Sequence, residues 1–200
     1  MVLKFEHIDA PGDEEGTLVA NGYGGLVWSN VQAINPNRSH FKDSGLAHGA
    51  VSGNSVAFNA FESAAHIKAI DADFAFKSGY FTGAFNNGLT VTVTAFDNNV
   101  QVGQKTFVVD YDAPTFVRFG HKFDSVDEVV IATEGGTDAD SHDHGTGTAV
   151  AMDDLNITLE AARPPAQQAY HADAAFVDVA HHLPPLAPMH ESGFSHWMFA

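Results

Sequence analysis

The chain has 200 residues, 44% of them hydrophobic, which is enough for one sizeable core plus an appendage and predicts one domain rather than two. Nine Lys and Arg against 25 Asp and Glu give a formal charge of −16, which disfavours nucleic acid and anionic lipid surfaces as partners and favours divalent cations. Because cysteine is absent, a disulfide framework, a thiolate zinc site and a cysteine nucleophile are excluded.

The N-terminal segment has the pattern of a strand. Leu3 and Phe5 alternate with Lys4 and Glu6, and this period of two predicts an extended run over residues 2–8. No basic region leads into an apolar stretch, so no signal peptide is visible at the N-terminus. The sequence also has no run of about 18 apolar residues, so we expect no membrane span.

Two aromatic side chains follow beside a cluster of glycines. Three glycines surround Tyr23, and Trp28 lies in the extended run that comes next. Because aromatic rings stack on the apolar faces of sugars, Tyr23 and Trp28 are the candidate glycan-binding residues. The alternative is that these rings pack in the core, which is the commoner place for such a tryptophan.

The middle of the chain reads as strands and turns. Residues 40–53 are polar and small, and their Ser-Gly pairs predict turns rather than an ordered helix. A short strand is expected over 54–61. The clearest prediction is a hairpin whose apolar positions alternate with threonines and whose turn is Asp97-Asn98-Asn99. Its apolar positions are Leu89, Val91, Val93 and Ala95.

The spacing of the strands predicts the fold class. About ten short strands recur at intervals of about 8–12 residues, with no helical period before residue 160, which is typical of a sandwich or barrel. The chain contains 16 phenylalanines, and such bulky side chains suit the layer between two packed sheets. We therefore expect an all-β, two-sheet antiparallel sandwich.

An acidic and histidine-rich loop precedes the last strand. Mixed carboxylate and imidazole ligands suit zinc or another transition ion, and Asp alternating with Gly and Ser also resembles calcium loops. The candidate ligands are Asp138, Asp140, His142, Asp143 and His144. A solvated loop without metal is the alternative.

The closing strand is expected over 148–160. Its two predicted faces are a core face of Ala149, Ala151, Leu155, Ile157 and Leu159, and an outer face of Val150, Met152, Asn156 and Thr158. Asp153 has the parity of the core face, so its charge requires a cation or several hydrogen bonds. Together with Asp154 it is the first candidate for a metal site, and a strand end open to water is the alternative.

The composition changes near residue 161 to Ala, Pro and His. We therefore expect a sandwich over 1–160 and an irregular C-terminal tail over 161–200. Three roles for the tail stay open: disorder, docking of its aromatic residues onto a partner or onto the sandwich, and an export address.

The ordered motifs GYGGLVW, SGNSVAFN, PTFVRF, FDSVDEVV and AMDDLNI, within residues 3–159, resemble small jelly-roll domains of secreted bacterial proteins, many of which are PEP-CTERM-sorted or type I-secreted. The opening FE and closing DD are similar to the ends of MAM-type domains and carbohydrate-binding modules. In those domains the first and last strands are neighbours and hold a structural cation. The resemblance thus implies a calcium ion (Ca²⁺) on Glu6, Asp153 and Asp154.

The tail departs from a PEP-CTERM signal, because it lacks the Pro-Glu-Pro motif, the membrane-spanning stretch and the basic end. It resembles type I substrates in its uncleaved, apolar C-terminal end. This resemblance implies an extracellular or cell-surface location.

The leading hypothesis is a non-catalytic, extracellular binding module for a glycan or a matrix component. One alternative is a structural protein that self-assembles through its tail. Another is a glycan-active enzyme on the same scaffold. The enzyme is less favoured, because hydrolysis needs two carboxylates about 5–10 Å apart in a cleft, and the candidates for such a pair are Asp153-Asp154 and the 138–143 loop.

Overall fold

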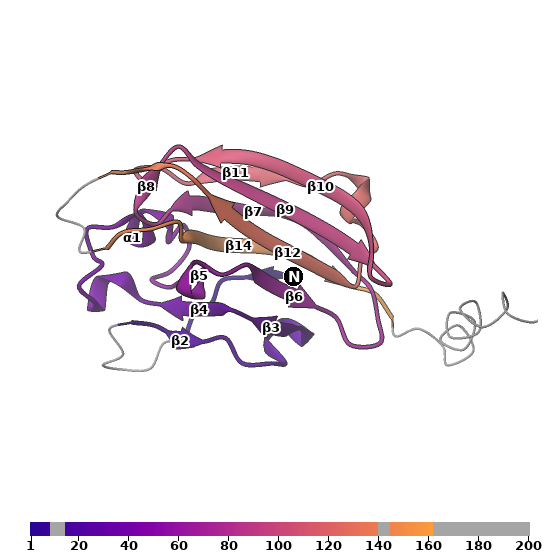
Figure 1. Ribbon diagram of the computed structural model, residues 1–200. Helices are drawn as coiled ribbons and strands as arrows, with labels where there is room; N and C mark the ends of the chain where they lie inside the picture. The colour runs from indigo at the N-terminus through magenta and orange to yellow at the C-terminus, as the bar shows by residue number, and fades with distance from the viewer. Residues whose placement is uncertain (9–14, 140–144, 162–200) are drawn as a thin grey trace, which may run out of the picture. The chain divides into compact units, whose positions relative to one another are not determined.

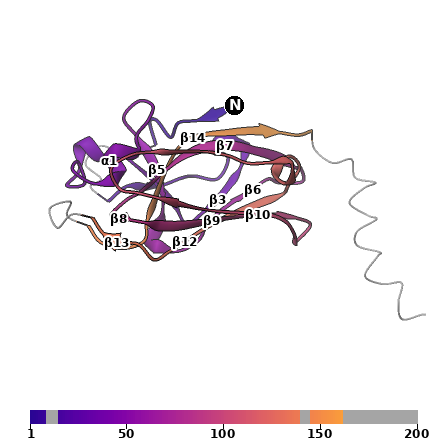
Figure 2. The ribbon, with the colours of Figure 1, turned by 90° about the horizontal axis from the view of Figure 1, so that it is seen from above.

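The computed structural model describes residues 1–8, 15–139 and 145–161, all within one compact unit, Met1–Arg163. Two antiparallel sheets form its two layers (Figures 1 and 2). Sheet A runs in the order β11 (Thr115–Arg118), β7 (Phe74–Gly83), β14 (Val150–Leu159), β5 (Val56–Asn59), β4 (Val31–Ile34) and β2 (Thr17–Leu18). Sheet B runs in the order β10 (Val100–Val109), β9 (Leu89–Asp97), β12 (Glu128–Glu134), β6 (Ala65–Lys68) and β3 (Val27–Ser29).

Smaller elements complete the unit. β1 (Val2–Leu3) pairs with β14, and β8 (Asn86–Asn87) pairs with β13 (Thr137–Asp138). The helical turns are η1 (Tyr23–Gly25), η2 (Pro36–Arg38), α1 (Gly45–Gly49), η3 (Ala60–Glu62) and η4 (His121–Phe123). Among the described residues, no helix has the length and apolar character needed to cross a membrane.

The order of pairing makes this sandwich a jelly roll. β9 pairs with β10 as a hairpin, and around it β7 pairs with β11, β6 with β12, and β5 with β14, each pair antiparallel. These nested pairs alternate between the two sheets, which is the double Greek key of a jelly roll. The predicted all-β, two-sheet antiparallel jelly-roll sandwich is confirmed.

The β9–β10 hairpin follows the sequence pattern closely. Its four predicted apolar positions on β9 are buried in the core between the sheets. Asn98 and Asn99 form the turn with φ of 51° and 62°, the backbone that a two-residue hairpin turn requires and that asparagine tolerates. Local turn chemistry and alternation therefore suffice to specify this element.

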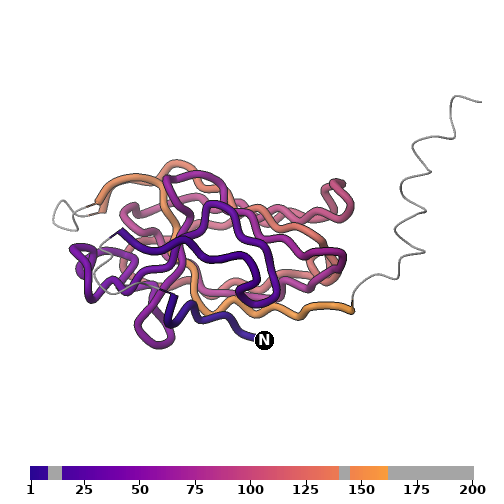
Figure 3. The backbone as a smooth tube through the Cα atoms, turned by 90° about the horizontal axis from the view of Figure 1, so that it is seen from below, coloured from indigo at the N-terminus to yellow at the C-terminus, as the bar shows by residue number. Residues whose placement is uncertain are grey.

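The predicted strand over 2–8 is wrong beyond Leu3. Phe5 and His7 have φ of 58° and 67°, so the chain leaves the extended conformation after β1. The expected alternation survives in part, because Leu3 and Phe5 are both buried. β1 lies beside β14, with Val2 opposite Asn156 (Figure 3). The first and last strands are thus neighbours, as the resemblance implied.

The predicted faces of β14 are wrong in its first half and at Leu159, which is 40% exposed at the end of the strand. Val150 and Met152 pack in the main core, whereas Ala149 and Ala151 belong to a second, smaller apolar cluster. Asp154 has a φ of 49°, and the pairing with β7 shifts register between Asp153 and Asn156. This bulge exchanges the two faces, so that the core positions become Leu155 and Ile157. Asp153 therefore has the parity of Ala151.

The second cluster contains residues from α1, β4, β5 and the loop after β7. Its buried members are Ile34, Leu46, Val56, Ala84, Phe85, Ala149 and Ala151. The expectation of turns without a helix in 40–53 is wrong, because Ser44 caps α1 by accepting a hydrogen bond from the Leu46 backbone N–H at 3.1 Å. α1 thus buries Leu46 against this cluster.

Candidate functional site

A pocket of about 250 Å³ opens beside the second cluster, where β5 ends and β4 begins. Its apolar wall is formed by Phe41, Leu46, Phe58, Phe85 and Ala149. Its polar lining comes from Glu15, Gln32, His40, Asn59, Glu62 and Thr146, and Phe61 completes it. We call this the Phe61 pocket. An apolar surface with a few convergent polar groups is the usual make-up of a small-molecule site.

Phe61 is held in an unfavourable conformation at this pocket. Its side chain is 84% exposed, and its φ of 53° is an outlier for a bulky residue. The next residue, Glu62, also has a positive φ, of 56°. Each such residue costs about 1–3 kcal/mol, and such strain clusters at functional sites. The turn therefore presents an aromatic ring to solvent at a cost in stability.

Ring contacts order the wall of the pocket. Phe41 and Phe85 have centroids 5.6 Å apart, and the His40 ring lies 4.0 Å from that of Phe41. These separations fall near or within the range of favourable aromatic pairs. The wall is thus a packed surface that does not need to form on binding.

Hydrogen bonds fix the polar lining. Buried Asn59 donates to the Ser63 carbonyl at 3.2 Å and accepts from the Val150 backbone N–H at 2.7 Å, which joins the turn after β5 to β14. Glu62 accepts from the Thr148 hydroxyl at 3.4 Å. A side chain at Gly147 would collide with the Glu62 carboxylate, so glycine leaves that carboxylate its place. The exposed ring and carboxylate therefore stand on a rigid support.

The two aromatic residues singled out in the sequence pack together elsewhere. Trp28 is only 6% exposed, and its indole N–H donates to the Tyr23 carbonyl at 2.9 Å. The alternative that Trp28 belongs to the core is confirmed. The Tyr23 ring is half-buried and stacks on Phe5 with centroids 5.5 Å apart. Contact of Tyr23 or Trp28 with a glycan stays a prediction.

The hydroxyl of Tyr23 also serves the fold. It accepts a hydrogen bond from the Phe5 backbone N–H at 2.8 Å. Burial raises the pKa of Tyr23 above its ordinary value, although this hydrogen bond lowers it. Tyr23 thus ties η1 to the segment after β1, and its ring is wedged rather than projecting.

The three carboxylates of the predicted calcium site all contact the loop 51–55. Asp153 accepts from the Ser52 backbone N–H and Asp154 from the Ser52 hydroxyl, both at 2.7 Å. Glu6 accepts from the backbone N–H groups of Asn54 and Ser55, both at 2.9 Å. The segment after β1 and the last strand thereby meet over one short loop.

Asp153 is the most perturbed carboxyl among the described residues with a resolved shift. It is 0% exposed, and burial raises its pKa to about 6. The backbone N–H groups of Ser52 and Asp154 lower this pKa, while the charge of Asp154 raises it. A buried carboxylate without a counter-charge is costly, and a divalent cation would supply that charge.

Side chains alone do not complete a metal site in the described residues, where no three His, Cys, Asp or Glu side chains form a group that could hold an ion. Calcium at Asp153 would therefore also need backbone carbonyl oxygens, which it accepts readily. In the second candidate, Asp138 is exposed on β13. Asp140, His142, Asp143 and His144 lie outside the described residues.

Sequence reasoning missed the Phe61 pocket. The alternation over 54–61 placed Phe61 in a strand, but β5 ends at Asn59 and the chain turns at η3. Without a Gly or Pro at Phe61 or Glu62, the sequence offers no turn signal for this left-handed backbone. The pocket is built from segments distant in sequence, so only the fold brings them together.

No protein-family model matches this sequence, and no curated protein matches it significantly. Among solved structures, the chain is similar to TmCBM61 in complex with beta-1,4-galactotriose. The alignment covers 74% of this chain and 97% of that chain, with 12% sequence identity and a TM-score of 0.36. A likeness at this level adds nothing to the fold, which the strand pairing itself establishes.

Proposed function

We propose that the protein is a non-catalytic binding module that holds one sugar ring of a glycan in the Phe61 pocket. The observation that carries the proposal is the exposed, strained Phe61 at the mouth of an aromatic-walled pocket. Strain of this kind persists where it serves a site, and here it presents a ring face to solvent.

The chemistry of the lining suits a sugar. A pyranose has an apolar face that stacks on an aromatic ring and hydroxyl groups around its edge. Phe61 offers such a ring, and Glu62 and Gln32 offer carboxylate and amide groups for hydroxyls. The volume of 250 Å³ is below the ~300–1,000 Å³ of drug-sized sites, which limits the bound part to about one ring.

A glycan array with three proteins tests the proposal: the wild type, Phe61→Ala and Phe116→Ala. Phe116 is a matched control, because it is an exposed phenylalanine on β11 of sheet A that does not line the pocket. The wild type and Phe116→Ala should retain the same glycans, and Phe61→Ala should lose them by about tenfold or more in affinity. Equal retention by all three would contradict the proposal.

Two experimental outcomes would assign the protein to another functional class. Glu15 and Glu62 both line the pocket, and a pair of carboxylates is what a glycosidase uses. Release of shorter sugars from a bound oligosaccharide would therefore identify an enzyme. Filaments that vanish on removal of residues 161–200 would instead identify a self-assembling surface protein.

We also propose a structural calcium ion beside Asp153, with Asp154 and Glu6 as further oxygen ligands. The support is the gathering of these carboxylates over the loop 51–55 and the burial of Asp153. Calcium would hold the loop 51–55, the segment with Glu6 and the strand with Asp153 together, and it would remove the cost of the buried charge. Weak extracellular calcium sites fit the proposed location outside the cell or at its surface.

Melting curves in calcium and in chelator test this ion. Calcium at about 100 times its Kd should stabilise the wild type by about 2.7 kcal/mol, and chelation should reverse the gain. Asp153→Asn should lose the calcium effect, and Asp112→Asn, a change at an exposed aspartate, should retain it. A wild-type melting curve that is identical in calcium and in chelator would contradict the proposed calcium site.

A further inference from the structure

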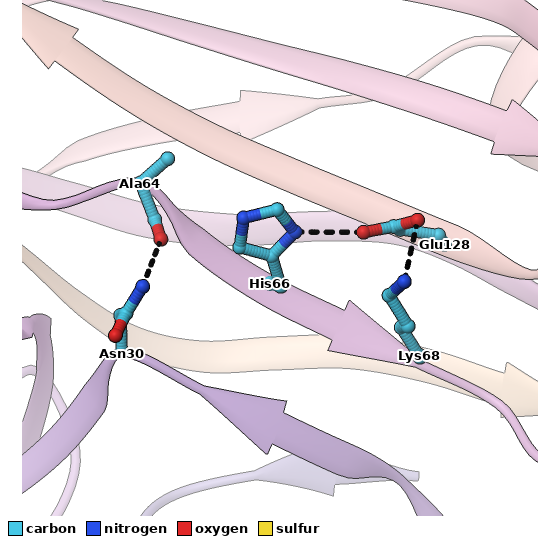
Figure 4. Close-up of polar contacts among 5 residues, drawn as sticks. All are labelled: Asn30, Ala64, His66, Lys68 and Glu128. Atoms are coloured by element: carbon cyan, nitrogen blue, oxygen red, sulfur yellow. Dashed lines mark hydrogen bonds and ion pairs between the residues drawn. The ribbon is translucent and has the colours of Figure 1, made fainter.

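A second cleft, of about 330 Å³, lies on the outer face of sheet B and is lined by Val27, Ser29, Asn30, His66 and Lys68. Figure 4 shows Asn30 and Lys68 on either side of His66, with Glu128 beyond His66 on β12. The cleft belongs to the opposite sheet from the Phe61 pocket and shares no lining residue with it.

One carboxylate holds both cationic side chains of this cleft. Glu128 accepts from His66 Nδ1 at 2.7 Å and from Lys68 Nζ at 2.9 Å. Its side chain is only 14% exposed, whereas that of Lys68 is 48% exposed. Burial raises the pKa of the Glu128 carboxyl, but its hydrogen bonds with His66 and Lys68 outweigh burial and hold the pKa below its usual value. Glu128 thus stays ionised and fixes both side chains.

The cleft retains hydrogen-bonding capacity after these bonds. Lys68 uses one of its three N–H groups on Glu128, and the second ring nitrogen of His66 has no partner among the residues that the structure describes. Asn30 donates its amide to the Ala64 carbonyl at 3.1 Å, which leaves its carbonyl oxygen for a ligand. The exposed Ser29 adds a hydroxyl.

When His66 is protonated, the local charge of this cleft differs in sign from that of the whole chain. The groups that face His66 are Glu128 on β12 and Lys68 on its own strand, and β3 contributes no charged side chain. Lys68 and Glu128 cancel, so protonation of His66 leaves one net positive charge in a protein of formal charge −16. Histidine is the side chain whose charge ordinarily changes between about pH 5 and pH 8.

We propose that this cleft binds a carboxylate-bearing sugar, a uronic acid unit, and binds it more tightly as the pH falls. Lys68 and protonated His66 contact the carboxylate, and Ser29 and Asn30 contact hydroxyl groups. Because the anion favours the imidazolium and the imidazolium favours the anion, binding and protonation strengthen each other. The site is independent of the Phe61 pocket, and it gives the module a second, charged specificity.

Titration of the ¹⁵N-labelled protein with digalacturonic acid tests this site, with galactobiose as the neutral counterpart and acetate as the plain anion. Digalacturonic acid should shift the backbone amides of residues 27–30 and 64–68, with affinity about tenfold higher at about pH 5.5 than at about pH 8. Galactobiose and acetate at equal concentration should leave these amides in place. If either produced the same shifts, or digalacturonic acid produced none, the proposal would be overturned.

Four variants separate the effect of charge on binding from an effect on folding. Lys68→Met keeps the aliphatic stem but should weaken digalacturonic acid binding by about tenfold at both pH values, whereas Lys77→Met, at an exposed lysine of β7, should not. His66→Gln should bind with no pH dependence. Phe61→Ala should bind digalacturonic acid as the wild type does, so failure of one site is distinguishable from failure of the other. Equal affinities of Lys68→Met and Lys77→Met, or an unchanged pH profile in His66→Gln, would refute the proposal.

Discussion

Tyr23 and Phe61 both lie in one-turn helices between strands, yet one ring is packed and the other is presented to solvent. In η1 and at its N-terminal cap the left-handed positions are all glycines, Gly22, Gly24 and Gly25, so the turn is unstrained and the Tyr23 ring can lie on Phe5. In η3 the left-handed positions are Phe61 itself and Glu62. Glycines around an aromatic residue therefore indicate a turn without backbone strain. A strained backbone at the aromatic residue itself indicates a candidate site.

The largest expected effect contrasts truncation of the two rings. Tyr23→Ala removes a ring that contacts Phe5 and leaves the Phe5 backbone N–H without its acceptor, so we expect a loss of about 3 kcal/mol in the free energy of unfolding. Phe61→Ala should stay within about 0.5 kcal/mol of the wild type. Urea denaturation measures both. A Tyr23→Ala protein as stable as the wild type would mean that the Tyr23 ring projects into solvent. Tyr23 would then again be a candidate glycan-binding residue.

The second prediction concerns a carboxylate. Like the two rings, the carboxylates differ in exposure, because Asp153 is buried whereas Glu62 is exposed. The pKa of Asp153 in the folded protein, about 6, exceeds its ordinary value of 3.8, so between these values the folded state holds a proton that the unfolded chain has released. In chelator, this group alone should therefore raise stability by on the order of 3 kcal/mol as the pH falls from about 7 to about 4.

Asp153→Asn isolates that contribution from the other titrating groups. The difference in unfolding free energy between the wild type and this variant should change with pH in chelator, and calcium should abolish or reverse the trend. A difference that is flat across this pH range would show that Asp153 keeps its ordinary pKa.

A smaller effect tests the strain at Phe61. Glycine adopts a positive φ without penalty, so Phe61→Gly should raise the free energy of unfolding by about 1 kcal/mol while weakening glycan binding. Phe116→Gly, at an extended position of β11, should instead lower stability. A loss of stability in Phe61→Gly would show that its backbone is not strained.

The smallest effect concerns the boundary near residue 161. Because β14 ends at Leu159, removal of residues 161–200 should change the free energy of unfolding by less than about 0.5 kcal/mol. Cooperative thermal unfolding of the truncated chain would support this boundary. An insoluble product would place the tail in the core.

The sequence predicted those parts of the fold that depend on local rules. Alternation and the Asn98-Asn99 turn determine the β9–β10 hairpin, strand spacing predicted a sandwich or barrel, and the resemblance to known domains predicted the jelly roll. The sequence did not predict the bulge at Asp154, because one extra residue exchanges the faces of β14 and no Gly or Pro marks its position.

The candidate sites divide in the same way. Glu6 and the Asp153-Asp154 pair were found because charge is costly in a buried strand and because their order along the chain resembles that of known domains. Phe61 was not found, since its exposure depends on a turn that Asn59 of β5 joins to β14. Long-range packing, which periodicity does not report, decides such positions.

The most direct test of the Phe61 pocket is the amide chemical-shift map of the ¹⁵N-labelled protein with the best glycan from the array. The account predicts that the largest shifts cluster at the residues that line the pocket, namely 15, 32, 40, 41, 46, 58, 59, 61, 62, 85, 146 and 149. It also predicts that Phe61→Ala erases these shifts while the rest of its spectrum stays native. Shifts concentrated at residues 22–28 instead, and retained in Phe61→Ala, would contradict the account and assign the ligand to Tyr23.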